Sequence, residues 1–376
     1  MKYYIIAGEA SGDLHASNLM KSLKEIDPEA QFRYYGGDLM QAHGGTLVKH
    51  YKEMAFMGFV EVLANIRTIS KNLNQCKLDL TQNKPDVVIL VDYPGFNLRI
   101  AKFAFEAGLK VFYYISPKIW AWKQSRVHTI KKYVHQMFTI FPFETDFYAQ
   151  FDYKVNYIGN PLLDAIEQAK TTLSDSESFR SKYKLDKRPI VAVLPGSRKQ
   201  ELTHHLPRFA EVMPLFPDIQ FVIAGISSMP DQMYDSYLHN APCTRITDAT
   251  YELLHHSSAA WVASGTATLE TALFDVPQVV CYHTNPITFR IAYLLVNVKQ
   301  ISLVNLILKK VAVKELVQWL FTKENLVEET NLLLHNNDYI LQMKNEYRIL
   351  REMLGQKGAS DKAAKLMIDY LKSDNK

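Results

Sequence analysis

Three segments of the chain combine small residues with polar groups in a spacing that could bind an anion. They are AGEASGDLH at Ala7–His15, LPGSRKQE at Leu194–Glu201 and VASGTATLE at Val262–Glu270. Small residues let a ligand approach the backbone closely, and the free N–H groups at a helix start attract anions. Each segment includes or follows the end of an apolar run, so each is expected at the end of a strand.

The second segment offers backbone N–H groups at Gly196 and Ser197 and a planar guanidinium at Arg198. A guanidinium matches the geometry of two phosphate oxygens. The alternative is a plain turn with a surface arginine. The position after a strand and the composition together favour contact with a phosphate.

In the third segment, Ser264, Gly265 and Thr266 turn the chain into a helix, and Glu270 lies about one turn inside it. The helix start would hold a diphosphate. A carboxylate beside that anion would repel it, but one turn away it can accept two hydrogen bonds from a vicinal diol. Because a nucleotide supplies both groups, we interpret Glu270 as a ribose ligand. The alternative is a charge on a solvated helix face.

The first segment is less specific than the other two. Its glycines have the spacing GxxxG, whereas the dinucleotide-binding fingerprint requires GxGxxG. Two interpretations stay open: a strand-to-helix turn capped by Asp13, or a loop that contacts the substrate. The residues concerned are Glu9, Ser11, Gly12 and Asp13.

One acidic residue stands where a general base could act. Asp92 follows the β-branched run Val87–Val91, and Pro94 and Gly95 end that strand. A carboxylate in this position could take the proton from a sugar hydroxyl that attacks an anomeric carbon, which contributes roughly 10²–10⁴-fold in rate. Capping of the turn or of the next helix is the competing interpretation, and the residues alone favour neither.

These segments need a scaffold, and the hydrophobic pattern predicts one. Apolar strand patterns alternate with helical patterns in both halves of the chain, which is typical of parallel sheets covered on both faces. The predicted strands are Tyr3–Ala7, Asp86–Val91, Lys110–Ile115, Gln136–Ile140, Ile190–Leu194, Gln220–Ala224, Ala259–Ala263 and Gln278–Cys281. The predicted helices include Leu14–Ile26, Leu98–Ala107, Tyr251–His256, Thr266–Phe274, Asn325–Met353 and Asp361–Leu371.

The expected fold is therefore α/β, with two Rossmann-like doubly wound domains that face each other across a cleft. A change of texture over 159–187, rich in charge and serine, marks the link between them. We place the N-terminal domain at 1–165 and the C-terminal domain at 186–350. The helix within 351–376 is expected to cross back to the N-terminal domain, within one chain or between two copies, which leaves a homodimer open. Ligands of such sheets bind at the carboxyl ends of the strands.

Composition limits the class of protein. The chain has 376 residues, 48% of them hydrophobic, and a formal net charge of +4, which is too small by itself to indicate nucleic-acid binding. Its three cysteines, Cys76, Cys243 and Cys281, are scattered and fit a reducing compartment better than a disulfide framework. Because no apolar run reaches the length of a signal-peptide core or a membrane span, we expect a cytoplasmic protein.

Together these segments resemble the lipid-A-disaccharide synthase family, glycosyltransferases with two Rossmann-like domains in the GT-B architecture. The resemblance also rests on MGFVEVL at Met57–Leu63, VDYPGFN at Val91–Asn97 and YYISPKIWAW at Tyr113–Trp122. The segments follow the family's order and extend over most of the chain.

The resemblance implies UDP-2,3-diacylglucosamine as donor and 2,3-diacylglucosamine 1-phosphate as acceptor. An inverting reaction would give the β-1,6-linked disaccharide 1-phosphate and UDP, with Asp92 as the base on the acceptor 6-hydroxyl and with Arg198 and Glu270 on the nucleotide. No metal and no cofactor are implied, because the helix start and Arg198 would meet the charge of the leaving diphosphate. The resemblance adds three donor-site residues, Asn305, Glu315 and Gln318.

The chain departs from the family pattern at three positions. Gly95 stands where the family usually has an acidic residue, Val304 where it has a proline, and Lys314 where a proline precedes the glutamate. The first departure weakens the case for a second carboxylate near Asp92. The other two affect the loop around Asn305.

An enzyme of acylated sugars must reach a bilayer, and one apolar stripe gains importance from the resemblance. By pattern alone the stripe is typical of a core helix. We expect part of it to contact acyl chains and the inner face of the cytoplasmic membrane, with basic flanks at Arg67 and Lys71. A second apolar and basic stretch lies within 287–310, and the aromatic residues of 113–122 line either an acceptor pocket or a core. The stripe consists of Met57, Phe59, Val60, Val62, Leu63 and Ile66.

Two other functions stay open. A UDP-sugar 2-epimerase uses a similar two-domain scaffold but would need acid and base residues around the sugar C2. A non-catalytic nucleotide-sugar-binding protein would bind UDP tightly and turn over neither sugar.

Overall fold

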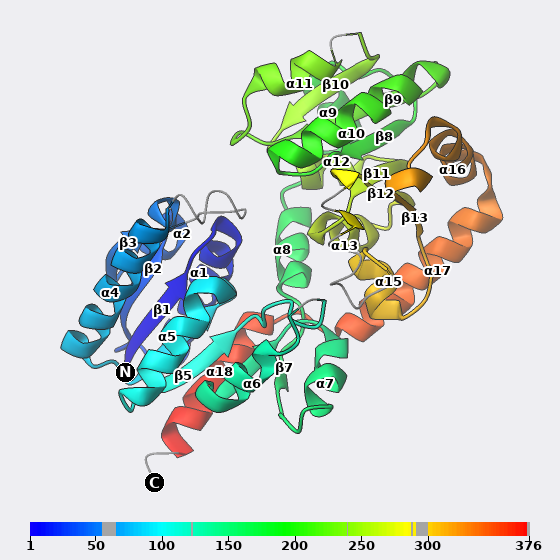
Figure 1. Ribbon diagram of the computed structural model, residues 1–376. Helices are drawn as coiled ribbons and strands as arrows, with labels where there is room; N and C mark the ends of the chain where they lie inside the picture. The colour runs from blue at the N-terminus through cyan, green and yellow to red at the C-terminus, as the bar shows by residue number, and fades with distance from the viewer. Residues whose placement is uncertain (55–64, 122, 239, 287–288, 291–299, 374–376) are drawn as a thin grey trace. The chain divides into compact units, whose positions relative to one another are not determined.

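The chain forms two compact units in a computed structural model that describes residues 1–54, 65–121, 123–238, 240–286, 289–290 and 300–373 (Figure 1). Unit 1 comprises Met1–Pro161 and Gln356–Lys376, and unit 2 comprises Leu162–Gly355. The predicted link therefore contains regular structure, with α8 (Pro161–Lys170) and α9 (Ser176–Tyr183) inside it.

Unit 1 contains a seven-stranded parallel sheet in the order β3-β2-β1-β4-β5-β6-β7. Strands β1, β4 and β5 are buried along almost their whole length, as expected where helices cover both faces of a parallel sheet. The strands are β1 (Lys2–Ala7), β2 (Gln31–Gly36), β3 (Thr46–His50), β4 (Val87–Val91), β5 (Lys110–Tyr114), β6 (Gln136–Thr139) and β7 (Asn156–Tyr157).

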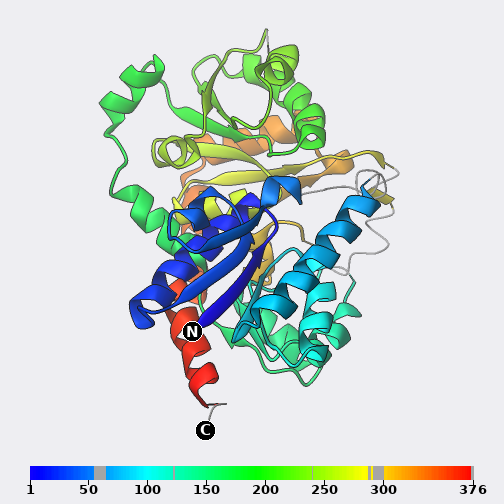
Figure 2. The same cartoon turned by 90° about the vertical axis from the view of Figure 1, so that its left-hand side faces the viewer.

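Helices α1 (Ala10–Ile26) and α4 (Ile66–Asn83) lie on opposite faces of this sheet (Figure 2). Alternate side chains of β1 meet them, because successive residues of a strand point to opposite faces. Tyr3 belongs to the core cluster that α1 joins, whereas the Tyr4 hydroxyl donates to Asp79 of α4 at 2.7 Å. The last helix, α18 (Ala359–Ser373), red in Figure 1, packs on α1. The remaining helices are α2 (Asp38–Gln41), α5 (Pro94–Glu106), α6 (Arg126–Tyr133), α7 (Pro142–Ala149) and the 3-10 helix η1 (Tyr51–Glu53).

Unit 2 contains a six-stranded parallel sheet in the order β10-β9-β8-β11-β12-β13. Numbered within each unit, both sheets run third, second, first, fourth, fifth, sixth, which is the Rossmann order, and unit 1 adds a seventh strand at the edge. The prediction of two Rossmann-like doubly wound domains is therefore confirmed. The strands are β8 (Ile190–Leu194), β9 (Gln220–Gly225), β10 (Cys243–Thr247), β11 (Ala259–Ala263), β12 (Gln278–Tyr282) and β13 (Lys314–Val317).

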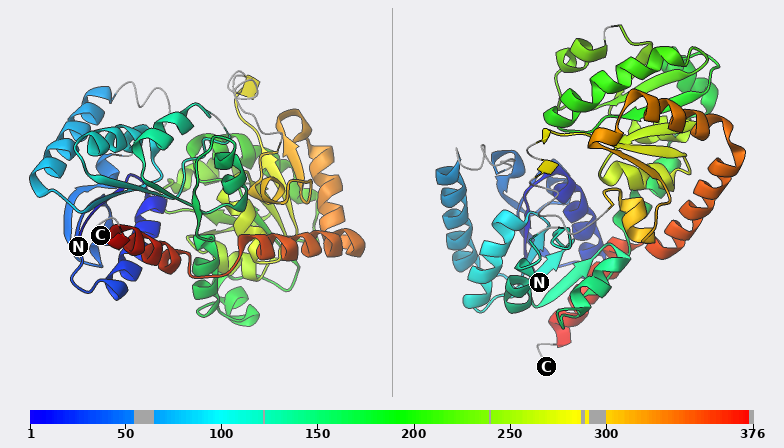
Figure 3. Two further views of the ribbon diagram at one scale, coloured as in Figure 1. Left: turned by 90° about the horizontal axis from the view of Figure 1, so that it is seen from below. Right: turned by 45° about the vertical axis from the view of Figure 1, so that its right-hand side comes forward.

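The two faces of the unit 2 sheet have separate cores. Phe179 of α9 and Leu253 of α12 (Thr250–His255) join the cluster on one face. On the other face, Trp261 stacks on Phe209 of α10 (Lys199–Val212) and donates its Nε1–H to Thr330 of α16 (Lys323–His335) at 3.0 Å. Figure 3 shows α16 and α17 (Asn337–Leu354) in orange beside this sheet. The other helices are α11 (Asp231–Leu238), α13 (Thr266–Leu273), α15 (Leu303–Leu308) and the 3-10 helices η2 (Met213–Leu215) and η3 (Gln318–Leu320).

Several element boundaries differ from the sequence predictions. The first helix begins at Ala10 instead of Leu14, and α5 begins at Pro94 instead of Leu98. The long helix predicted over Asn325–Met353 is two helices, because Asn336 leaves the helical conformation (φ −97°, ψ 95°) and its side chain caps α17. Strands β2, β3, β10 and β13 were not identified. Three of these are edge strands, whose exposed positions are polar and interrupt any apolar run.

Candidate functional site

In each unit the strand order reverses beside the first strand, and such switch points are where open α/β sheets bind ligands. In unit 1 the switch lies between β1 and β4, and the next residues along the chain are Gly8 and Asp92. In unit 2 it lies between β8 and β11, which are followed by the Gly196 loop and the Ser264 turn. All the segments chosen for their chemistry therefore lie at the switch points of the two sheets.

The Asp92 turn of unit 1 has an unusual backbone. Asp92 and Tyr93 both adopt left-handed conformations, with φ of 41° and 47°, each of which costs about 1–3 kcal/mol. The Asp92 carbonyl accepts hydrogen bonds from Asn97 Nδ2 at 2.8 Å and from the Tyr113 hydroxyl at 2.5 Å. The Asp92 N–H donates to the carbonyl of Tyr114 at 3.2 Å. Because its N–H and carbonyl are both engaged, the backbone of Asp92 is held in this strained conformation at the edge of the sheet.

Gly8 is required by this turn. A Cβ at Gly8 would lie 2.3 Å from the ring of Tyr93, whose hydroxyl donates to the carbonyl of Met54 at 2.7 Å. Any larger residue would displace the ring. The first glycine of AGEASGD therefore admits a neighbouring side chain, which is sufficient reason for its presence.

The Asp92 carboxyl is half-buried and has a raised proton affinity. Burial raises its pKa to about 6, with a smaller upward contribution from Glu9. The nearby charge of Lys118 and a hydrogen bond from the Tyr93 backbone lower the pKa. A carboxyl that titrates close to neutrality can take a proton at physiological pH, which is the property of a general base.

Asp13, in the first turn of α1, has a structural role. The Asp13 side chain is buried and accepts hydrogen bonds from the backbone N–H of Gly37 (2.7 Å), Leu39 (3.1 Å) and Met40 (3.2 Å). Asp13 therefore anchors the loop that enters α2 and does not cap α1. Substrate contact by this segment stays a prediction. Its residues occupy the cap and first turn of α1: Glu9, Ser11, Gly12 and Asp13.

The loop after β5 carries Lys118 and is held by α7. The Ser116 hydroxyl bonds the Tyr148 hydroxyl at 2.8 Å. Glu144, completely buried, accepts two backbone N–H groups at the start of α7, and burial raises its pKa to about 7. Trp120 is buried beside it. Trp120 is thus part of the interior, and Trp122 lies outside the described residues.

In unit 2, two backbone N–H groups of the loop after β8 donate to a glutamate that follows in the same segment. Glu201 Oε2 accepts hydrogen bonds from the backbone N–H of Ser197 at 2.8 Å and of Arg198 at 3.2 Å. Gly196 has a φ of 112°, and a Cβ there would lie 2.3 Å from the same oxygen. The Ser197 N–H, which the sequence analysis assigned to phosphate, is therefore bonded within the loop. Arg198 itself is exposed.

A buried histidine ties this loop to the end of β12. His205 Nδ1 bonds the carbonyl of Pro195 at 2.8 Å, and its Nε2 accepts from the N–H of His283 at 3.0 Å. Burial lowers the His205 pKa to about 4, so the ring is neutral and donates from Nδ1. The sequence analysis missed both His205 and Glu201. For Glu201 a signal existed, because a glutamate three residues after a helix cap commonly bonds the cap backbone.

The turn after β11 leaves open space before α13. The Ser264 hydroxyl donates to the carbonyl of Ile301 at 2.9 Å, and Gly265 has a φ of 140°. A Cβ at Gly265 would meet no atom within 4 Å. Thr266, the first residue of α13, is exposed. The helix start is therefore accessible to an anion.

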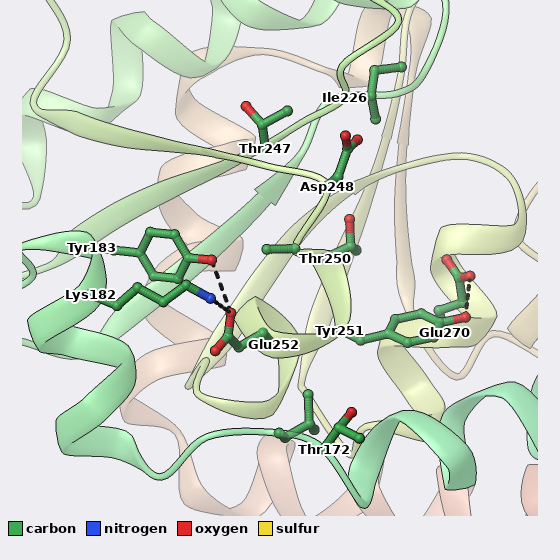
Figure 4. Close-up of a pocket in the computed structure, with 12 residues that line it drawn as sticks. Thr172, Lys182, Tyr183, Ile226, Thr247, Asp248, Thr250, Tyr251, Glu252 and Glu270 are labelled. Carbon is green, nitrogen blue, oxygen red and sulfur yellow. Dashed lines mark hydrogen bonds and ion pairs between the residues drawn. The ribbon is translucent and has the colours of Figure 1, made fainter.

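Glu270 lines a pocket of about 750 Å³ within unit 2 (Figure 4). The hydroxyl of Tyr251 donates to Glu270 Oε1 at 3.0 Å. Burial raises the pKa of Glu270, and this hydrogen bond lowers it. The pocket is lined by Thr172, Leu173, Lys182, Tyr183, Ile226, Thr247, Asp248, Ala249, Thr250, Tyr251, Glu252 and Glu270.

Asn305 and Glu315 support the turn after β11. Asn305 is buried; its Nδ2 donates to Glu315 Oε1 at 2.8 Å, and its Oδ1 accepts from the N–H of Val313 at 3.0 Å. The Glu315 carboxylate also accepts from the N–H of Ile301 and Ser302, both at 3.0 Å. These bonds hold the segment whose carbonyl receives the Ser264 hydroxyl. Donor contact by the two side chains stays a prediction.

Gln318 makes a comparable pair of bonds to the backbone. Its Oε1 accepts from the N–H of Thr284 at 3.2 Å, and its Nε2 donates to the carbonyl of the same residue at 2.8 Å. Gln318 thereby fixes the chain that leaves β12. Its predicted contact with the donor is untested by these bonds.

Of the three residues that depart from the family pattern, two are exposed and one is buried. Gly95 is exposed, and a Cβ there would meet nothing within 4 Å, so an acidic side chain would fit. Val304 is buried in α15, and Lys314 is exposed on β13. None of the three departures removes a residue to which the sequence analysis assigned a chemical role.

The predicted lipid-facing stripe lies mostly outside the described residues. Ile66, the first residue of α4, is 58% exposed. Within the described ranges, no helix is long and apolar enough to cross a membrane. Nor do the described residues include a cluster of three or more histidine, cysteine or acidic side chains placed to hold a metal ion. The undescribed members of the stripe are Met57, Phe59, Val60, Val62 and Leu63.

Comparison with solved structures shows the fold. A UDP-GlcNAc 2-epimerase from Neisseria meningitidis, bound to UDP-GlcNAc, aligns with a TM-score of 0.66 at 13% identity over 94% of this chain and 99% of that one. The calicheamicin glycosyltransferase CalG4 aligns with a TM-score of 0.61 at 14% identity over 98% of both chains. Both enzymes share the two-domain architecture with this chain.

Sequence relatives are much closer. The lipid-A-disaccharide synthase of Trichlorobacter lovleyi is 37% identical over 374 residues, which cover 98% of this chain and 97% of the relative. Lipid-A-disaccharide synthase 1 of Legionella pneumophila (strain Lens) is 35% identical over 99% of this chain and 98% of the relative. The family model described as lipid-A-disaccharide synthetase matches residues 3–368. The chain belongs to the lipid-A-disaccharide synthase family.

Proposed function

We propose that this chain is a glycosyltransferase that condenses UDP-2,3-diacylglucosamine with 2,3-diacylglucosamine 1-phosphate. The products are the β-1,6-linked lipid A disaccharide 1-phosphate and UDP. The observation that carries the proposal is the strained Asp92 turn at the switch point of unit 1, in a chain whose family makes this disaccharide. Burial raises the pKa of its carboxyl to about 6, which suits a general base.

Asp92 acts on the acceptor. Its carboxylate takes the proton of the 6-hydroxyl as that oxygen attacks the anomeric carbon of the donor. The new glycosidic bond forms as the bond from the anomeric carbon to the UDP oxygen breaks, and attack opposite the leaving group inverts the configuration. With a pKa of about 6, Asp92 is mostly ionised at neutral pH and ready to accept the proton.

Unit 2 binds the donor. The Arg198 guanidinium and the accessible start of α13 at Gly265 and Thr266 contact the diphosphate, and they offset the charge that develops as UDP leaves. Glu270 accepts hydrogen bonds from the ribose hydroxyls. These groups supply the electrostatic stabilisation without a metal ion or a cofactor.

We assign acceptor and membrane contact to the N-terminal domain, residues 1–165, and donor binding to the C-terminal domain, residues 186–350. The helix within 351–376 belongs with the acceptor domain, since α18 packs on α1. The exposed Ile66 with the neighbouring Arg67 suits peripheral contact with the inner face of the cytoplasmic membrane.

The test is incubation of the purified chain with both acylated glucosamines, followed by mass spectrometry. We expect the tetraacyl disaccharide 1-phosphate and one UDP per disaccharide. Incubation with UDP-N-acetylglucosamine alone is the comparison. Appearance of its manno epimer, without disaccharide in the first reaction, would replace the proposal with an epimerase. Tight UDP binding without turnover of either sugar would leave a binding protein.

A further inference from the structure

We propose that Tyr251 is a positioning residue for the nucleotide: its hydroxyl holds the Glu270 carboxylate in the orientation that receives the ribose diol. Tyr251 thereby contributes to the preference of the site for a ribonucleotide. The inference rests on the proposed function, since it presupposes that Glu270 binds the ribose of UDP. Nothing in the residue spacing indicates this role, because Tyr251 and Glu270 lie on different helices.

The geometry of the pocket carries the inference. Tyr251 lies in the first turn of α12 and Glu270 lies in α13, and both side chains line the pocket of unit 2 (Figure 4). The hydrogen bond of 3.0 Å engages Glu270 Oε1, so Oε2 is the oxygen that remains to accept from a ligand. A diol needs acceptors in a fixed direction, and the bond to Tyr251 supplies that direction before the ligand arrives.

The Tyr251 hydroxyl is itself held. Its ring packs against Phe274, with 5.4 Å between ring centroids, at the end of α13. Burial and the neighbouring Glu270 carboxylate raise the pKa of Tyr251, so it remains protonated and acts as the donor in this pair. A glutamate side chain loses rotamer freedom when it binds a ligand, and fixing it in advance reduces that loss.

Glu252, the second glutamate of the pocket, is a useful comparison because both of its carboxylate oxygens accept hydrogen bonds. Glu252 accepts hydrogen bonds from Lys182 Nζ at 2.9 Å, the Tyr183 hydroxyl at 3.0 Å and the Ser174 hydroxyl at 2.7 Å. These donors lower its pKa, although burial acts in the opposite direction. Glu270 has the raised pKa of a buried acid with one such donor. Of the two glutamates, Glu270 keeps the capacity to accept hydrogen bonds from a ligand.

The remaining acid of the pocket is engaged by the backbone. Asp248 Oδ1 accepts from the N–H of Ser227 at 3.0 Å. The positive charge of Lys182 is paired with Glu252. Because Asp248, Lys182 and Glu252 have these partners, Tyr251 is the residue that we expect to orient Glu270.

Two tyrosines of the same pocket make a matched pair for the test. Tyr251→Phe removes the hydroxyl that bonds Glu270, and Tyr183→Phe removes the hydroxyl that bonds Glu252. Calorimetry would measure the affinity of the full chain and its variants for UDP and for 2′,3′-dideoxy-UDP. We expect Tyr251→Phe to weaken UDP by roughly 10–150-fold, the range for a hydrogen bond to a charged group, and dideoxy-UDP by less than about twofold. Tyr183→Phe should leave the ratio of the two affinities within about twofold of the original chain.

The outcomes separate the inference from the function on which it rests. Equal weakening of both nucleotides by Tyr251→Phe, or an unchanged ratio, would overturn the positioning role. Glu270→Ala tests the ribose assignment itself: it should weaken UDP much more than dideoxy-UDP. If Glu270→Ala weakens both equally, the ribose assignment fails and the inference with it. If it discriminates and Tyr251→Phe does not, the inference alone fails.

Discussion

The Asp92 turn of unit 1 and the Gly196–Glu201 loop of unit 2 occupy comparable places and treat a carboxyl group in opposite ways. Each joins a strand beside a switch point to the following helix. At Asp92 the carbonyl receives two side-chain donors, while burial raises the pKa of the carboxyl. At Glu201 the carboxylate itself receives two backbone N–H groups.

The difference fits the roles that we propose, a base at Asp92 and a supporting carboxylate at Glu201. At Glu201 the hydrogen-bonding capacity of the carboxylate is used to hold the loop. At Asp92 burial raises the pKa of the carboxyl, while the side chains of Asn97 and Tyr113 donate to the backbone carbonyl. The comparison fits the proposal that unit 1 supplies the base and unit 2 binds the donor.

The largest expected effect comes from Asp92→Asn. Asparagine adopts the left-handed conformation as readily as aspartate, so the turn should persist. It cannot accept the hydroxyl proton, and disaccharide formation should fall by roughly 10²–10⁴-fold. Mass spectrometry of the product measures the rate, and calorimetry with UDP should show nearly unchanged affinity. Turnover close to that of the original chain would remove Asp92 as the base and would erase the distinction between the two loops.

The pH dependence of turnover gives an effect of intermediate size. Asp92 must be ionised to accept a proton, so kcat/KM should be constant above its pKa of about 6 and fall about tenfold per pH unit below it. Lys118 lowers this pKa, so Lys118→Gln should move the acid limb to higher pH. Glu9 raises it, so Glu9→Gln should move the limb to lower pH. An acid limb that neither substitution moves would mean that another group controls it.

The sequence was sufficient for the fold because the interior strands are continuous apolar runs. Strands such as Val87–Val91 and Ile190–Leu194 are buried on both faces, and that burial is visible in their composition. The edge strand Thr46–His50 is buried on neither side completely, so its mixed composition resembles a loop. Strand order then determined which loops meet, and the segments selected for their chemistry lie at the two switch points.

The hydrogen-bond partners of individual polar groups could not be predicted from the sequence in the same way. Residue types placed Ser197 near a ligand and the family resemblance placed Asn305 there, but the bonds that engage them involve Glu201 and Glu315. Such bonds depend on side-chain directions that a single sequence does not specify. The left-handed pair at Asp92 was equally invisible, since it is imposed by Tyr113 and other neighbours distant along the chain.

The smallest expected effect tests the supporting loop of unit 2. Glu201→Ala removes the acceptor of the Ser197 and Arg198 N–H groups, and the loop should lose its fixed conformation. Because the Arg198 guanidinium would then be less well placed on the diphosphate, we expect KM for the donor to rise about fivefold, equivalent to about 1 kcal/mol, with kcat changed less than about twofold. Glu201→Gln is the matched control, since its amide oxygen can accept the same two bonds, and it should restore KM. If Glu201→Gln instead lowered kcat as severely as Asp92→Asn, the Glu201 charge would take part in the reaction. Both loops would then carry a carboxylate that takes part in the reaction, and the distinction drawn between them would be lost.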